Sequence, residues 1–99
     1  MENDNTRVGE LVRKCIAENN AAEMAKMTGA IMAVILSENL GEDLTFAGKC
    51  APKFAEGLDG ANLLKRSAEI AVGLDDEALG KAFRAHLEDA VSNHMSKPF

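Results

Sequence analysis

Apolar residues dominate the segment from Met24 to Leu36, in which Lys26 is the only charged residue. Wound as an α-helix, this segment carries two apolar stripes that lie about 140° apart around the helix axis. One stripe holds Met24, Met27, Ile31, Val34 and Ile35, and the other holds Ala25, Gly29, Met32, Leu36 and Leu40. A helix that is apolar on most of its circumference must be covered on most sides. We therefore predict an all-α protein, a compact bundle built around this central helix.

The central helix keeps only a narrow strip that the pattern predicts to face water. Asn20 followed by Glu23 resembles a capping box at the start of this helix, and Gly41 suits the left-handed residue after its end. We expect the helix to run to about Leu40. The strip predicted to face water holds Glu23, Lys26, Ala30, Ala33 and Ser37.

Two further amphipathic segments flank the central helix. Thr6 is predicted to cap the first helix, and Asp43 or Thr45 is predicted to start the third. Pro52 interrupts the third pattern, since proline removes a backbone donor and clashes with the preceding turn. We expect a kink there, or two short helices, so the bundle has five helices, or six if Pro52 divides the third. The predicted inward face of the first helix is Val8, Leu11, Val12, Cys15 and Ile16.

The tripeptide Gly-Leu-Asp occurs twice, at residues 57–59 and 73–75. Each copy has the composition of a helix stop, a hydrophobic contact and the N-cap of the next helix. This predicts a fourth helix over 61–72 and a fifth from Asp76 to about Met95. The apolar stripe expected on the fifth helix holds Leu79, Phe83, Leu87, Ala90, Val91 and His94. No segment alternates apolar and polar residues as a strand would.

The composition fits one globular domain over residues 1–99, with 1–5 and 96–99 expected to fray. Hydrophobic residues make up 46% of the chain, and the absence of Trp and Tyr predicts an aliphatic core without the flat rings that stack on bases. A net charge of −5 opposes nonspecific binding to nucleic acid or anionic membranes. The polar N-terminus carries no secretory pattern, and the central apolar run is too short to span a bilayer. We therefore expect a cytoplasmic protein.

The residue types that bind metals do not occur in a metal-binding pattern. The chain has no Cys-x-x-Cys and no His-Glu-x-x-His, and His86 and His94 would lie about 12 Å apart along one helix. Cys15 and Cys50 each fall on an apolar helix face, where a buried thiol is the usual occupant. A redox switch between them requires that their helices touch within disulfide distance. We predict no metal and no cofactor.

Candidate catalytic residues are equally scarce. Adjacent acids occur at 42–43, 75–77 and 88–89, near predicted helix starts or on outer faces, where they complement the helix dipole or face solvent. No nucleophile motif or phosphate-binding loop accompanies them. Since no pair of residues has complementary catalytic roles, we predict that the protein is not an enzyme and has no catalytic residues.

The segment 68–83 resembles a helix-turn-helix, with Gly73 in the turn and Leu74, Leu79 and Phe83 directed inward. The resemblance implies DNA binding through the helix after the turn. That helix begins with three acids at 75–77, however, which would face phosphates with like charge. DNA binding would require a continuous positive face containing Lys65, Arg66, Lys81 and Arg84.

Two functions from different classes rank ahead of DNA binding, which stays the third. The first is a small protein–protein interaction module, accessory or regulatory, acting as a homodimer through the stripe Ala25, Gly29, Met32, Leu36 and Leu40. If Met32 and Leu36 were buried within one monomer, the observation that supports this homodimer hypothesis would be lost. The alternative is a small-molecule-binding bundle. Its pocket would be lined by Met27, Ile31, Phe46, Phe54 and Phe83, with His86 or Cys50 as the polar contact.

Overall fold

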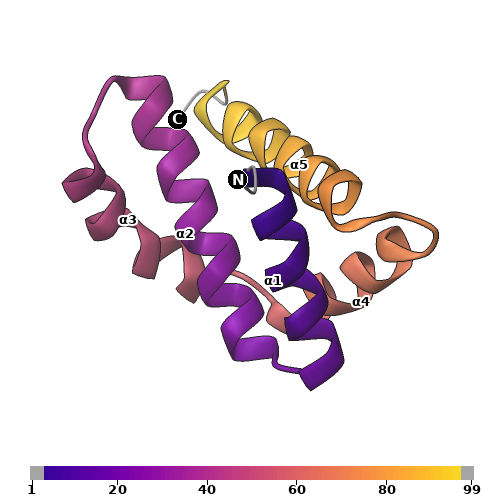
Figure 1. The fold of residues 1–99 in the computed structure, drawn as a ribbon. Helices are drawn as coiled ribbons and strands as arrows, with labels where there is room; N and C mark the ends of the chain where they lie inside the picture. The colour runs from indigo at the N-terminus through magenta and orange to yellow at the C-terminus, as the bar shows by residue number, and fades with distance from the viewer. Residues whose placement is uncertain (1–3, 97–99) are drawn as a thin grey trace.

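A computed structural model describes residues 4–96, which form five α-helices (Figure 1). Between residues 4 and 96 there is no strand, and the predicted all-α fold is confirmed. The helices are α1 (Asp4–Glu18), α2 (Ala21–Leu40), α3 (Leu44–Glu56), α4 (Gly60–Ala71) and α5 (Asp76–Ser96).

The helices associate mainly as two pairs. α3 packs along α2, and α1 packs along α5, the helix at the other end of the chain (Figure 1). α2 also contacts α4, α5 and, to a small extent, α1, so it touches all four other helices. α3 approaches no helix other than α2 within 8 Å, measured between Cα atoms. The predicted central helix therefore has the expected position, and α3 covers only one of its sides.

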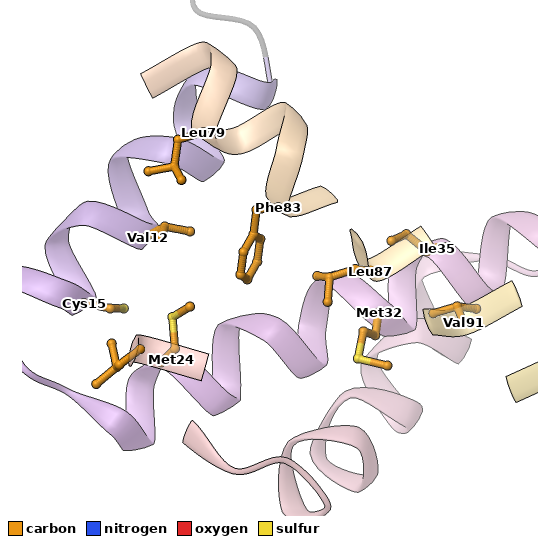
Figure 2. Close-up of a cluster of buried hydrophobic side chains, with 10 residues drawn as sticks. Val12, Cys15, Met24, Met32, Ile35, Leu79, Phe83, Leu87 and Val91 are labelled. Atoms are coloured by element: carbon orange, nitrogen blue, oxygen red, sulfur yellow. The ribbon is translucent and has the colours of Figure 1, made fainter. Parts of the chain in front are cut away.

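The hydrophobic core is aliphatic around a single buried ring. Phe83 of α5 lies at the centre, with Val12 and Leu79 on one side and Leu87 and Met32 on the other (Figure 2). α3 contributes only Ala47 to the fully buried set. The cluster of buried core residues is Val12, Cys15, Met24, Met32, Ile35, Leu64, Leu79, Phe83, Leu87 and Val91.

Glycines let the paired helices approach to backbone contact. A Cβ atom on Gly9 would overlap the backbone carbonyl of Asp76, and one on Gly80 would overlap that of Asn5. In the other pair, a Cβ atom on Gly29 would lie 2.7 Å from the backbone nitrogen of Ala55. Both helix pairs thus depend on the absence of a side chain at their closest point.

Most of the predicted helix ends are confirmed. The side chain of Asn20 accepts a hydrogen bond of 3.1 Å from the backbone N–H of Glu23 and caps α2. Gly41 adopts the left-handed conformation with φ of 71°, and Glu42 N–H donates to the carbonyl of Ser37, as in a Schellman motif. Asp43 rather than Thr45 caps α3.

The two Gly-Leu-Asp copies share only part of their geometry. Asp59 and Asp75 both cap the following helix, by accepting from the N–H groups of Asn62 and Ala78. Gly73 has φ of +79°, whereas Gly57 has φ of −87°. The aspartate therefore has the same role in both copies, and a left-handed glycine is required only in the second.

Two expectations about helix continuity are corrected. α1 begins at Asp4, so Thr6 lies inside it, and residues 4 and 5, expected to fray, are helical. Pro52 does not divide α3, which is one helix from Leu44 to Glu56. The carbonyl that Pro52 leaves without a donor belongs to Gly48, an exposed residue where water can replace the missing N–H. Residues 1–3 and 97–99 and the side chain of His94 lie outside the described part.

The predicted solvent strip of α2 is wrong at its C-terminal end. Glu23, Lys26 and Ala30 are exposed as expected, but Ala33 is 0% and Ser37 2% exposed. Both residues continue the i, i+4 row that starts at Gly29, and Gly29 itself faces the backbone of α3. The hydroxyl of Ser37 donates to the carbonyl of Val34 at 2.8 Å, so its burial leaves no unpaired group.

Candidate interaction surface

An apolar groove lies between α1 and α2. Its volume is about 340 Å³. Its lining comes mainly from α1 and α2, and Arg84 of α5 also contributes. The lining residues are Asp4, Arg7, Val8, Leu11, Met27, Ala30, Ile31, Val34, Ile35 and Arg84.

Large aliphatic side chains are left half-covered in this groove. Met27, Ile31 and Val34 are half-buried, and Leu11 on the opposite wall is 44% exposed. The three α2 side chains belong to the stripe that starts at Met24. An apolar concave surface of this kind can accommodate apolar side chains of another chain.

The groove stays open because α1 is held by α5 rather than by α2. Gly9 and Gly80 bring α1 and α5 into backbone contact. Arg13 of α1 also binds the start of α5: its Nε lies 2.6 Å from a carboxylate oxygen of Asp76, and its Nη2 donates to the carbonyl of Leu74. α1 therefore packs along α5 and leaves this face of α2 only partly covered.

Both signs of charge surround the groove. Arg84 Nη2 lies 3.8 Å from Glu38 of α2, and Arg84 Nε lies 3.5 Å from Glu88, one turn along α5. Lys26 is an exposed residue of α2, next in the chain to the groove residue Met27. An apolar centre with mixed charges at its edge is typical of protein–protein contact surfaces.

The residues predicted for the interface are mostly used within the monomer. Gly29 faces the backbone of α3, and Met32 is buried in the core. Leu36 is half-buried and packs against the core, and Ala25 is half-buried on α2. Only Leu40, at the end of α2, is clearly exposed. The stripe that the sequence predicts to be free is therefore largely covered, and the open apolar surface lies on the other side of the helix.

The residues proposed for a ligand pocket do not converge. Met27 and Ile31 line the groove beside α1, whereas Phe54 lines a separate hollow with Met32 and Leu58. Phe83 is a core residue whose edge reaches a third hollow, of about 290 Å³, beside exposed His86. The structure does not assemble the single pocket that the alternative function needs.

The two cysteines are free and cannot pair. Since no residue of α1 lies within 8 Å of α3 between Cα atoms, Cys15 and Cys50 are too far apart for a disulfide. Burial raises the pKa of the Cys15 thiol, and the nearby carboxylates of Glu23 and Glu18 raise it further. Among the residues that the structure describes, no group of three His, Cys, Asp or Glu side chains could hold a metal ion.

The adjacent acids have structural partners. Asp43 and Asp75 cap helices, Asp76 binds Arg13, and Glu88 binds Arg84. Each of the three clusters of adjacent acids therefore contains at least one residue with a structural contact.

Acids also occupy the start of the helix that the helix-turn-helix resemblance assigns to DNA. Asp75 and Asp76 both lie at the N-terminal end of α5. Of the four cations that a positive face would need, Lys65, Arg66 and Lys81 are exposed, and Arg84 is paired with two glutamates.

The sequence matches no protein-family model, and neither curated proteins nor solved structures show a significant match. Within residues 4–96, no helix is long and apolar enough to cross a membrane.

Sequence reasoning misses the α1 wall of the groove. The apolar pattern assigns Leu11 to the inward face of the first helix. Leu11 lies four residues after Arg7 and three before Lys14, so it belongs equally to a polar row on the outer side. The position of Leu11 in a row with Arg7 and Lys14 is the sequence signal that could have identified it as exposed. The contribution of Arg84, from the far end of the chain, has no local sequence signal.

Proposed function

We propose that this protein is a protein–protein interaction module that acts as a homodimer, with the groove between α1 and α2 at the centre of the interface. The observation that carries this proposal is the partly exposed aliphatic surface that Leu11 of α1 forms with Met27, Ile31 and Val34 of α2. Burying this surface in a second chain removes apolar area from water. The proposal keeps the expected class of function and moves the interface to the opposite side of α2.

A second copy suits this surface because its edges carry charges of both signs. A two-fold interface is formed by the same patch on both chains and must be complementary to itself. Within residues 4–96, other large apolar side chains are also exposed, but they do not line the groove. They are Leu40, Leu44, Ile70 and Val72.

Sedimentation velocity over a range of protein concentrations tests this proposal with two matched variants. Val34→Lys places a charge in the groove, whereas Val72→Lys places the same charge at an 81% exposed valine in the turn before α5. We expect a dimer for the wild type and for Val72→Lys. For Val34→Lys we expect a dissociation constant at least about tenfold higher, equivalent to about 1.4 kcal/mol.

A wild-type protein that stays monomeric at every concentration would overturn the proposal. Equal weakening by the two valine variants would overturn the placement of the interface in the groove. Circular dichroism of each variant checks that the helices remain folded.

A further inference from the structure

Four residues of α2 form one row along the open side of the helix. Lys26, Ala30, Val34 and Glu38 follow one another at intervals of four residues, and each step turns by about 40° around the helix, so the row runs obliquely to the helix axis. Lys26, Ala30 and Glu38 are exposed, and Val34 is half-buried in the groove. The row spans about 18 Å along the helix axis and has a positive end, an apolar middle and a negative end.

The row is antisymmetric in charge about its midpoint. Lys26 and Glu38 lie six residues on either side of Met32, and Ala30 and Val34 lie two residues on either side. A two-fold axis that crosses the helix at this level, with the two helices crossing at about −50° so that their oblique i, i+4 rows run alongside each other, would bring each Lys26 opposite Glu38 of the other copy. The same operation brings Ala30 opposite Val34, a small residue opposite a larger one.

We infer, on the basis of the proposed function, that two copies of this chain pair α2 against α2 in antiparallel orientation, with Lys26 of each copy opposite Glu38 of the other. A parallel pair would place Lys26 opposite Lys26 and Glu38 opposite Glu38, so charge repulsion opposes it. The two charges thereby select both the direction and the register of the pair, while the apolar middle supplies the buried surface.

The monomer holds neither charge of the row tightly. Within residues 4–96, Lys26 makes no ion pair. The side chain of Glu38 is 61% exposed, and its distance to Arg84 is 3.8 Å, at the long end for an ion pair. Ala30, with only a methyl group between these ends, permits close approach of a second helix.

Charge reversal tests the pairing through two single variants and their mixture. Lys26→Glu gives a row with two negative ends, and Glu38→Lys gives a row with two positive ends. We expect each variant alone to dimerise at least about tenfold more weakly than the wild type. An equimolar mixture should form a heterodimer of wild-type strength, because both ends of the negative row then lie opposite the positive ends of the other row. The double variant Lys26→Glu/Glu38→Lys should dimerise like the wild type.

Native mass spectrometry of one isotopically labelled variant mixed with the other unlabelled variant measures the heterodimer directly. Glu88→Lys is the control for Glu38→Lys, because it also removes a carboxylate from Arg84 but lies outside the row. Lys65→Glu is the control for Lys26→Glu, since Lys65 is an exposed lysine on α4. Both controls should dimerise like the wild type.

The outcomes separate this inference from the proposed function. A monomeric wild type overturns both. A wild-type dimer that Val34→Lys weakens, but whose charge variants show neither weakening nor recovery on mixing, overturns only the antiparallel pairing.

Discussion

Two sides of α2 are covered to very different extents in the fold. On one side, the small residues Gly29, Ala33 and Ser37 are buried, and α3 packs at backbone distance from Gly29. On the other side, Met27, Ile31 and Val34 present larger side chains, and α1 leaves a groove above them. One side of α2 is thus covered because its small residues allow α3 to pack closely and because α2 is the main partner of α3. The other side stays partly open because its side chains are larger and α1 packs mainly on α5.

The neighbouring helices explain the contrast as much as α2 does. Among the described helices, α3 comes within 8 Å of α2 alone, measured between Cα atoms, so α2 is its main partner. α1 instead has glycine contacts with α5 and the Arg13 contacts to Leu74 and Asp76. The open side of α2 is therefore a consequence of the affinity between the first and last helices.

Gly29→Val, on the side of α2 that α3 covers, should cause the largest loss of stability. The new Cβ would lie 2.7 Å from the nitrogen of Ala55 and 2.9 Å from the carbonyl oxygen of Ala51, both backbone atoms. Separating α2 from α3 should lower the free energy of unfolding by about 3 kcal/mol or more, as measured by urea denaturation.

The control for this change is Gly48→Ala, on the outer face of α3, where a Cβ meets nothing within 4 Å. It should raise stability by about 0.5–1 kcal/mol, the gain of alanine over glycine in a helix. If Gly29→Val lowered the free energy of unfolding only slightly, α3 would not be packed closely against α2 at this point.

Two isoleucines one turn apart compare the core-facing side with the open side directly. Ile35 is buried in the core, whereas Ile31 is half-buried and lines the groove. Truncation to alanine should cost about 2.5 kcal/mol at Ile35 and about 1 kcal/mol at Ile31. Urea denaturation at a concentration where the protein is monomeric measures both, and equal costs would contradict an open groove.

The cysteines give the smallest effect, on reactivity rather than stability. Cys15 is buried on α1, and its raised pKa delays formation of the thiolate as pH rises, whereas Cys50 on α3 is half-buried. Iodoacetamide labelling followed by mass spectrometry should show Cys50 reacting roughly tenfold faster. The labelling rate of Cys15 should still increase above pH 9.0, its ordinary thiol value. Faster labelling of Cys15 would show that α1 opens readily.

The sequence is sufficient for the fold class and most helix ends, because these depend on local signals. The caps at Asn20, Asp43 and Asp59 and the stop at Gly41 follow from residue types and their spacing. The alternative of two short helices divided at Pro52 is wrong, because the cost of a proline depends on whether water can reach the carbonyl one turn before it, which is a tertiary property.

The sequence is insufficient for the site, because two apolar stripes on one helix carry no information about which neighbour covers each. The pattern predicts the free side at Gly29 and Met32, and the structure leaves it at Ile31 and Val34. The small row of Gly29, Ala33 and Ser37 is a signal for the sealed side, since small residues mark close helix contacts. The association of α1 with α5 joins residues far apart in the chain and has no local signature.

The pairing of the first helix with the last has a consequence for how the chain is synthesised. Arg13 binds Asp76, 63 residues further along, so α1 lacks its main partner until α5, at residues 76–96, has left the ribosome. The α2–α3 hairpin, by contrast, is complete as soon as residue 56 has emerged. Early in translation the apolar face of α1 is therefore unprotected, and chaperone binding or premature association would act on that helix first.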